Sequence, residues 1–463
     1  MVDRNQIPKH ILDIQNKFSD AGYDIYLVGG SIRDLLHGRP VKDWDFATNA
    51  TPEQMLSLFP DAFYENLFGT VGIPLEKIEE TEHKGVVEVT TFRTEKGYAD
   101  RRHPESVAWG KTIEDDLSRR DFTMNAIALK LQTNDQGLLS HIIDPYNGQE
   151  DLKNKLIRAV GDPDLRFKED ALRMMRAIRF AAQLGFSIEE KTMLAITQDA
   201  PLLAEISKER VRDEMMKLLA SEYPYEGVML LKNTNLLEYI LPELLEGVGI
   251  SQERPGRHHK DDVFTHNVLS LKFCPSTDPV VRFATLIHDI GKPRVATKDE
   301  DGYIIFYNHE IAGAKVAYQV ADSLRFSKKE REKIVTLVRW HMFTVDENIT
   351  DSAVRRFIRR IGVDNVKDMM DLRVGDRLGG GTQTAESWRL KLFKKRVEEQ
   401  LAPEPFSVKD LAIDGNDIME ELHIKPSKQI GEMLQKLFEE VDEDLTKNTK
   451  EYLLDRVKEI AAA

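Results

Sequence analysis

Apolar residues in the first 150 positions follow two different spacings. Four of them recur every three to four residues, as on one face of a helix: Ile7, Ile11, Ile14 and Phe18. Three short runs rich in apolar and β-branched residues predict strands: 25–28, 44–47 and 86–92. The first run stops at Gly29-Gly30, and residues 32–36 can continue directly as a helix. This mixture predicts an α+β domain over residues 1–150, with a small mixed sheet and helices.

The pattern changes near Leu152, after which long helical stripes replace the strands. Their apolar residues include Leu172, Met175, Ile178, Leu184, Leu218, Leu230, Leu237 and Leu241. Two breaks interrupt the helices, one at 247–260 around Pro255-Gly256 and one at the glycine triplet 379–381. We therefore expect three all-α domains after the first, over residues 151–250, 251–385 and 386–463.

Composition narrows the class of protein. Hydrophobic residues make up 41 % of the 463 positions, enough for several cores. No apolar run reaches the roughly 18 residues of a membrane span, and the polar start lacks the apolar stretch of a signal peptide. The one cysteine, Cys274, fits a reducing compartment. These features predict a cytoplasmic protein with no membrane partner, and no obligate protein partner is evident.

The distribution of charged residues indicates whether the protein could bind nucleic acid. The net charge of −14 argues mildly against it, because phosphate neutralisation favours basic proteins. Two basic stretches, 355–360 and 389–396, nevertheless offer local cationic surface. Taken alone, each stretch is more simply a solvated helix face.

A first candidate site gathers glycines and carboxylates. Gly29-Gly30 lies between a strand and a helix, where free backbone N–H groups suit a phosphate. Asp43 and Asp45 are two residues apart, which in a strand places both on one face. Glu88 lies on a further predicted strand. Oxygen ligands grouped in this way suit Mg²⁺ and a two-metal phosphoryl site.

Six sequence blocks in the first half resemble one known family in content, order and spacing. They are residues 29–40, 42–48, 87–93, 116–128, 142–148 and 166–180. The blocks are similar to those of the bacterial-type class II tRNA nucleotidyltransferase and poly(A) polymerase family. The resemblance implies a nucleotidyltransferase head, then a helical neck, body and tail. It also implies tRNA as partner, and CTP and ATP as substrates.

The resemblance implies roles for individual residues. It implies that Asp43 and Asp45 bind Mg²⁺ and that Glu88 is the third catalytic carboxylate. The residues implied in nucleotide binding are Gly29, Gly30, Arg33, Arg120, Asp121, Glu169, Asp170, Arg173, Arg176 and Arg179. Asp170 and Arg173 would select the base, since Asp accepts from the exocyclic amine of C or A and Arg donates to a ring acceptor. We expect them on one face of one helix.

The implied reaction is template-independent addition of CCA to the tRNA 3′ end with release of pyrophosphate. A-only addition and poly(A) synthesis remain open. CC-only addition is disfavoured, because residues 93–108 retain the loop that CC-only members lose.

A second candidate site lies in the third predicted domain. Residues 286–293 resemble the core of the HD phosphohydrolase superfamily, which implies a divalent metal (Mn²⁺, Ni²⁺, Co²⁺, Fe or Mg²⁺). The resemblance points to His266, His288, Asp289 and Asp376 as ligands. His309 and His341 stay open between metal ligands, supporting groups and substrate contacts. An inactive HD fold kept for packing or tRNA contact is the alternative.

The C-terminal part offers candidate RNA contacts. Residues 405–418 resemble the start of the family's tail, and Arg359 and Lys395 are the candidate phosphate contacts in the two basic stretches. Two alternatives of another class remain: an HD phosphohydrolase whose head only binds RNA, and a non-catalytic RNA-binding protein. The complete carboxylate set argues against both.

Overall fold

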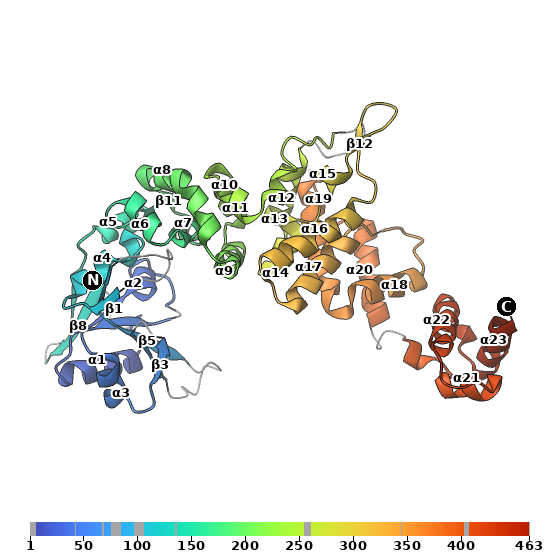
Figure 1. Ribbon diagram of the computed structural model, residues 1–463, viewed down its shortest axis with the longest axis horizontal. Helices are drawn as coiled ribbons and strands as arrows, with labels where there is room; N and C mark the ends of the chain where they lie inside the picture. The colour runs from blue at the N-terminus through green and yellow to red at the C-terminus, as the bar shows by residue number, and fades with distance from the viewer. Residues whose placement is uncertain are drawn as a thin grey trace. The chain divides into compact units, whose positions relative to one another are not determined.

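A computed structural model gives the fold (Figure 1). It describes residues 6–41, 43–66, 69–75, 85–96, 106–134, 137–253, 261–343, 345–401 and 407–462. The chain divides into two compact units, Met1–Leu245 and Glu246–Ala463. Of the predicted domains, 1–150 and 151–250 fall almost wholly within the first unit.

A seven-stranded mixed sheet forms the centre of the first unit, in the order β3-β4-β5-β2-β1-β8-β9. Its strands are β1 (Ile25–Val28), β2 (Asp45–Thr48), β3 (Phe63–Asn66), β4 (Thr70–Pro74), β5 (Val86–Thr91), β8 (Ala128–Asn134) and β9 (Gly137–Ile143). Only the β2–β5 pair is parallel among the strand pairs described in this sheet. The predicted α+β head is confirmed.

Helices bury the apolar faces of this sheet. All four residues of β1 are buried, because α1 (Lys9–Asp20) and α2 (Gly29–Leu36) both contact the strand (Figure 1). Ile11 and Phe18 of α1 and Ile32 of α2 are fully buried. Each such side chain contributes about 1.5–3 kcal/mol by leaving water. The remaining elements around the sheet are α3 (Pro52–Leu58), β6 (Arg93–Lys96), β7 (Ser106–Trp109) and α4 (Ile113–Ser118).

The rest of the first unit is helical, as predicted. Its elements are α5 (Gly148–Lys153), β10 (Leu156–Ile157), α6 (Pro163–Glu169), α7 (Leu172–Leu184), β11 (Ser187–Ile188), α8 (Glu190–Asp199), α9 (Lys208–Leu219), α10 (Pro224–Asn233), α11 (Leu236–Ile240) and α12 (Pro242–Leu245). Helix α7 is central because it packs against both α9 and α10. Ten of its thirteen residues are buried, so it serves as the core of this part.

The second unit is almost entirely helical. Its elements are α13 (Val263–Phe273), α14 (Pro279–Leu286), α15 (Lys292–Val295), β12 (Thr297–Lys298), β13 (Ile304–Ile305), α16 (His309–Ser323), α17 (Lys328–Trp340), α18 (Asp351–Ile361), α19 (Val366–Gly379), α20 (Trp388–Leu401), α21 (Gly415–Leu422), α22 (Lys428–Glu443) and α23 (Lys450–Ala462). The last three have a core of their own that includes Ile418, Leu437 and Leu453. No described helix is long and apolar enough to cross a membrane.

The arginines of the basic stretch 355–360 lie on two different sides of helix α18. Arg355 and Arg359 are four residues apart and point from α18 toward α22, where both guanidinium groups bind Asp442 at 2.7 and 2.5 Å. Burial would raise the pKa of Asp442, but the two arginines outweigh it and lower that pKa. Arg356 and Arg360 are exposed. Arg359, expected to contact RNA phosphate, is therefore engaged in an internal ion pair, and its RNA contact stays a prediction.

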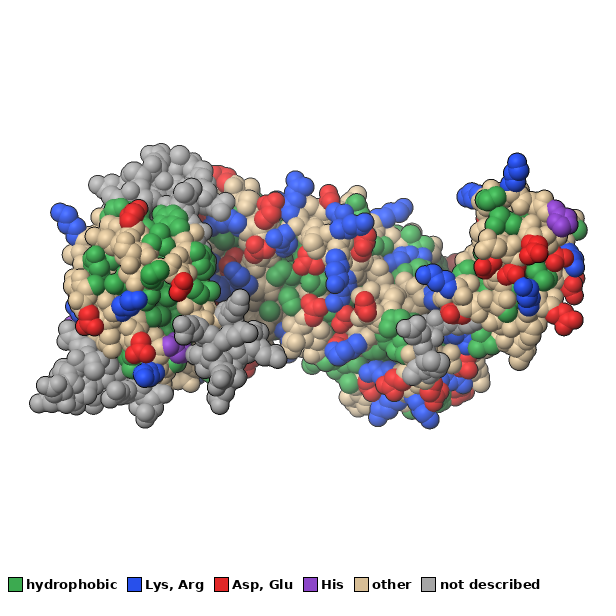
Figure 2. All heavy atoms as spheres, turned by 90° about the horizontal axis from the view of Figure 1, so that it is seen from below, with side chains coloured by type: hydrophobic (Ala, Val, Ile, Leu, Met, Phe, Trp, Pro, Cys, Tyr) green, Lys and Arg blue, Asp and Glu red, His purple; other side chains and the backbone are tan. Residues whose placement is uncertain are grey.

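Surface charge is mixed elsewhere. On the face drawn in Figure 2, Lys and Arg side chains are interspersed with Asp and Glu over the described surface. Lys395 is exposed on α20 and lies 3.8 Å from Glu399, a pair of the kind that adds little stability. It stays available as a candidate phosphate contact.

Replacing Asp442 by asparagine should destabilise the contact between α18 and α22. The change leaves the buried Arg355 guanidinium without its counter-charge, at a cost of about 3 kcal/mol. Urea titration of the intact chain, followed by hydrogen exchange of the α18 and α22 amides, measures this. Asp455→Asn, at an exposed position of α23, is the matched control. Equal protection in D442N and the native chain would show that the ion pair is dispensable.

Two candidate active sites

The parallel pairing of β2 with β5 places Asp45 directly opposite Glu88. Burial and then the nearby Glu88 carboxylate raise the pKa of Asp45 to about 6, with Asp43 adding to the effect and Arg120 opposing it. Asp43 precedes β2 and does not lie within it. The expected placement of Asp43 within the strand is therefore wrong, but its charge still acts on Asp45. Carboxylates grouped this way favour a cation.

The start of α2 approaches the same carboxylates. Gly29 has φ +66°, and a Cβ there would lie 2.9 Å from an Arg120 guanidinium nitrogen and 3.5 Å from an Asp45 oxygen. A side chain at this position would be strained and would clash with Arg120. A Cβ at Gly30 would lie 3.8 Å from an Arg33 guanidinium nitrogen, which is ordinary van der Waals contact. The helix start, two arginines and Asp45 therefore converge.

Hydrogen bonds fix the arginines of this site. Buried Asp116 accepts from Arg120 at 2.9 Å. The side-chain oxygen of Asn125 accepts from Arg33 at 3.2 Å, while its side-chain Nδ2 donates to Asp121 at 3.0 Å. Burial would raise the pKa of Asp121, but the guanidinium of Arg176 holds it well below the usual range. Asp121 is thus a charged anchor inside the unit.

The predicted base-selecting pair is arranged differently from expectation. Asp170 has extended backbone angles (φ −145°, ψ 103°) and lies between α6 and α7. The expectation that Asp170 and Arg173 lie on one helix is therefore wrong. One Asp170 oxygen accepts from the Leu172 backbone N–H at 3.1 Å, and the other binds Arg210 at 2.8 Å. Arg173 binds Glu169 at 2.5 Å.

Arg176 and Arg179 point to different partners. Arg176 donates to Asp121 beside the first site, whereas Arg179 is buried against α9 and donates to Glu214 at 2.6 Å. In this structure Arg179 therefore joins two helices, and its predicted contact with the triphosphate stays a prediction.

Sequence reasoning missed three residues that organise this site. Asp116 and Asn125 both lie in the block 116–128, where only the neighbouring Arg120 and Asp121 were singled out. Arg210 lies forty residues beyond its partner Asp170, and a lone arginine on an amphipathic helix carries no signal of its own.

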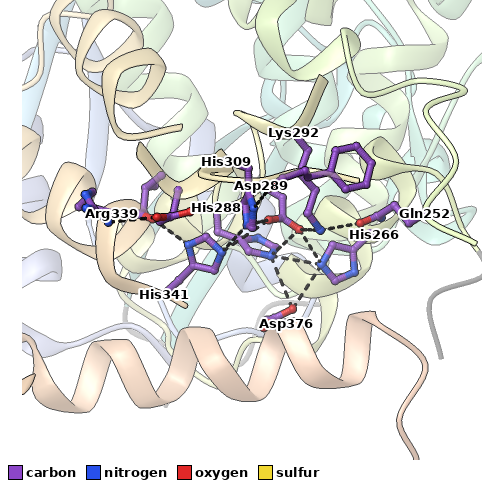
Figure 3. Close-up of polar contacts among 12 residues, drawn as sticks. Gln252, His266, His288, Asp289, Lys292, His309, Arg339, His341 and Asp376 are labelled. Carbon is purple, nitrogen blue, oxygen red and sulfur yellow. Dashed lines mark hydrogen bonds and ion pairs between the residues drawn. The ribbon is translucent and has the colours of Figure 1, made fainter. Parts of the chain in front are cut away.

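In the second unit, six side chains from five helical segments meet in one cluster, in which five are buried and Asp376 is partly exposed (Figure 3). They are His266 of α13, His288 and Asp289 after α14, His309 at the start of α16, His341 after α17, and Asp376 of α19. All four residues implied as ligands by the resemblance are present together, and His309 and His341 join them.

One carboxylate is shared by two groups of donors. Asp289 Oδ2 lies 3.3 Å from the Nε2 atoms of His266 and His288. Asp289 Oδ1 lies 3.2 Å from His309 Nε2 and 3.5 Å from His341 Nε2. Asp376 Oδ1 completes the first group, 3.3 Å from His266 Nε2. Such donor sets, joined by one bridging carboxylate, can hold two metal ions side by side.

Backbone carbonyls orient the imidazoles. The Nδ1 atoms of His288, His309 and His341 lie 2.7–2.8 Å from carbonyl oxygens three residues earlier in the chain. An N–H donated there leaves Nε2 as the acceptor that faces the cluster, which is the tautomer a metal needs. Burial would lower the pKa of His288, but Asp289 and Asp376 raise it to about 10, so a metal that binds at Nε2 would displace a proton from this imidazole. The donor chemistry fits a transition metal.

Glycines bring α13 and α19 together at this cluster. A Cβ at Gly375 would lie 2.5 Å from the Ser270 carbonyl oxygen, and one at Gly379 would lie 2.4 Å from the Ser270 hydroxyl. Only glycine permits this approach of the two backbones. The close crossing is what places His266 of one helix beside Asp376 of the other.

A cavity of about 440 Å³ opens onto the cluster. Lys292 lies on its wall, 2.5 Å from Asp289, and donates to the side-chain Oε1 of Gln252 at 2.6 Å. The buried Gln252 amide nitrogen has no hydrogen-bond partner within the described part of the chain. Arg373, also on the wall, binds Asp376 at 2.8 Å. These donors suit an anionic substrate. Lys292 lies in the HD-like block 286–293, but the sequence predicted no role for it. No sequence pattern indicated Gln252.

Models of three protein families match the chain. Residues 25–158 match the poly A polymerase head domain, 185–247 match the probable RNA and SrmB-binding site of polymerase A, and 303–457 match the tRNA nucleotidyltransferase domain 2 (putative). A CCA-adding enzyme of Geobacillus thermodenitrificans is 48 % identical over 237 residues, or 51 % of this chain and 55 % of that protein. The chain thus aligns with about half the length of that relative.

Other relatives match nearly end to end. A CCA-adding enzyme of Ligilactobacillus salivarius is 30 % identical over 98 % of this chain and 96 % of its own length. An A-adding tRNA nucleotidyltransferase of Deinococcus radiodurans is 34 % identical over 89 % and 90 %. The crystal structure of the Bacillus stearothermophilus CCA-adding enzyme in complex with CTP superposes with a TM-score of 0.70 and 28 % identity, covering 97 % of this chain and 96 % of that one. The chain therefore belongs to the class II tRNA nucleotidyltransferase and poly(A) polymerase family.

Proposed function

We propose that the protein adds CCA to the 3′ end of tRNA, using CTP and ATP. The main structural support for this activity is the pairing of Asp45 with Glu88 beside the start of α2. Arg33 and Arg120 also approach this point. The full-length relatives that are CCA-adding enzymes support this activity. An A-adding relative keeps A-only addition as the alternative. The loop that bears on CC-only addition falls mostly on 97–105, outside the described residues.

The residues of the head would divide the work of the reaction. Asp43, Asp45 and Glu88 would hold Mg²⁺, which neutralises triphosphate charge and makes the 3′-hydroxyl of tRNA more acidic when bound. Arg33 and Arg120 bind phosphate oxygens, and Asp170 and Arg173 read the base. The 3′-oxygen forms a bond to the α-phosphorus, its proton passes to solvent, and the bond to pyrophosphate breaks.

We also propose a metal-dependent phosphohydrolase activity for the second unit. It is favoured by the two donor groups that share Asp289 and by the cationic wall of the adjoining cavity. The substrates would be phosphoesters such as 2′,3′-cyclic or 2′-phosphate RNA ends. A water oxygen bonds to phosphorus, one P–O ester bond breaks, and the leaving oxygen takes a proton.

Lys395, on the exposed face of α20, would contact RNA phosphate, and the protein would work in the cytoplasm.

Nucleotide addition should depend on Asp45. With tRNA lacking CCA, the native chain should add three residues from CTP and ATP and none from UTP or GTP, read at single-nucleotide resolution. Asp45→Asn should reduce the rate by about 10³-fold or more, because it removes a carboxylate from the cation site. Asp61→Asn, at an exposed position of the same unit, is the control. Extension only of tRNA already ending in CC would identify an A-adding enzyme, and no extension would refute the proposal.

Metal binding in the head should weaken in acid. Because the pKa of Asp45 is raised to about 6, its carboxylate is charged above pH 6 and holds a proton below it. Mn²⁺ affinity should therefore fall about tenfold per pH unit as the pH drops below 6. Calorimetry in an Asp289→Asn background removes the shared ligand of the second unit from the measurement. Equal affinities at pH 5.0 and 7.5 would contradict Asp45 as a ligand.

The second unit should hold two metal ions. After loading with Mn²⁺ and desalting, elemental analysis should find two equivalents there in an Asp45→Asn background. The double variant His309→Ala with His341→Ala should keep one, since the donors His266, His288 and Asp376 remain. His423→Asn is the control, because His423 is exposed and asparagine tolerates its left-handed backbone. One equivalent in the native chain would mean that His309 and His341 are not ligands.

A further inference from the structure

A second cavity, of about 390 Å³, adjoins the metal cluster. Met342 lines both this cavity and the one over the cluster. Trp340 and the ligand His341 are consecutive, and Glu310, another wall residue, follows the ligand His309. Figure 3 shows Arg339 at the His341 end of the cluster, opposite Gln252 and His266. The cavity therefore lies next to the donor group formed by Asp289, His309 and His341.

Three arginines give this cavity a positive charge: Arg339, Arg356 and Arg360. Glu310 is the one acidic residue on its wall, and it pairs with Arg339 at 3.4 Å. Among the described residues no carboxylate pairs with Arg356 or Arg360. Such a concentration stands out in a chain of net charge −14. Guanidinium groups free of acidic partners suit phosphate, which their planar fork binds with two parallel hydrogen bonds.

Aromatic rings form the rest of the wall. The guanidinium carbons of Arg339 and Arg360 lie 4.3 and 4.9 Å from the Trp340 ring centre. Phe343 stacks on Phe393 with ring centres 5.3 Å apart. Trp340 is only partly buried, and Met342, on the shared rim, is 59 % exposed. Nucleic-acid bases stack on accessible aromatic rings, and arginine adds a cation–π contribution to such binding.

We propose that this cavity is a binding subsite for a phosphorylated nucleoside, with the base against Trp340 and a phosphate on Arg356 and Arg360. Its position beside His341 would then present the adjoining phosphoester to the metal cluster. That last step rests on the proposed phosphohydrolase function, whereas binding in the cavity does not. The ligand can come from two sources, a free nucleotide or the end of an RNA strand.

Photocrosslinking with peptide mapping tests the subsite directly. One arm uses 8-azidoadenosine 5′-monophosphate, and the other an octaribonucleotide with a 3′-terminal 4-thiouridine. Because mass spectrometry locates each crosslink, labelling in the first unit does not obscure the result. We expect labelling of the peptide that contains Trp340 and Met342. RNA labelling alone would identify a strand end as the ligand, and azidonucleotide labelling alone a free nucleotide, either of which supports the subsite.

Variants separate binding from general damage. Arg356→Glu with Arg360→Glu should lower labelling of this peptide at least about tenfold at subsaturating probe, and Trp340→Ala should do the same while Trp340→Phe retains it. Lys328→Glu, at the exposed start of α17, is the matched control. Circular dichroism melting confirms that each variant is folded. Absence of labelling near Trp340 with either probe, or labelling that survives the double charge reversal, would overturn the subsite.

The outcomes also distinguish the two proposals for this unit. Labelling does not require turnover, so labelling without hydrolysis of any phosphoester would leave the subsite standing and refute the phosphohydrolase function. Hydrolysis without labelling would refute the subsite alone.

Discussion

A charge removed from water must be compensated nearby, and both units are organised around that requirement. In the first unit, Asp45 lies buried beside Glu88, and Arg120 lies close enough to oppose their repulsion. In the second, one aspartate faces four imidazoles and a lysine. In the head this compensation is incomplete, since the pKa of Asp45 is raised, whereas in the second unit the lysine and imidazoles lower the pKa of Asp289. The fold around each site holds the carboxylates in place.

The two units achieve this by different means. In the head, backbone pairing holds the carboxylates in place, since the register of two parallel strands sets Asp45 against Glu88. In the second unit, helix packing holds the site residues in place, since glycines on α19 let α13 approach closely enough for His266 to meet Asp376. Strand register is rigid over short distances, whereas a helix crossing places side chains from distant segments at one point. The second unit accordingly draws its donors from segments more than one hundred residues apart in sequence.

Local features were predictable from the sequence, as were the site residues that the family resemblance named, but the other long-range pairings were not. The run 25–28 with its glycine stop gave β1 and α2 because burial and turn chemistry are local. Asp170 and Arg173 were expected on one helix, but Asp170 accepts from the Leu172 N–H, and this local bond competes with the helix. The partners of Asp170 and Arg359 lie 40 and 83 residues away, and no periodicity indicates them. Likewise, the motif His288-Asp289 indicated one metal, while the sharing of Asp289 with His309 and His341 required the fold.

Helix α18 carries its arginines in a fixed rotational phase. Arg355 and Arg359 point toward Asp442, and the next residue in each case, Arg356 or Arg360, lies on the wall of the aromatic cavity. Adjacent helical positions differ by roughly 100° about the axis. Deleting one residue near the start of this helix would keep every arginine in the sequence but rotate the set by that angle. The same four charges would then neither hold α22 nor face the cavity, so for this helix spacing matters as much as composition.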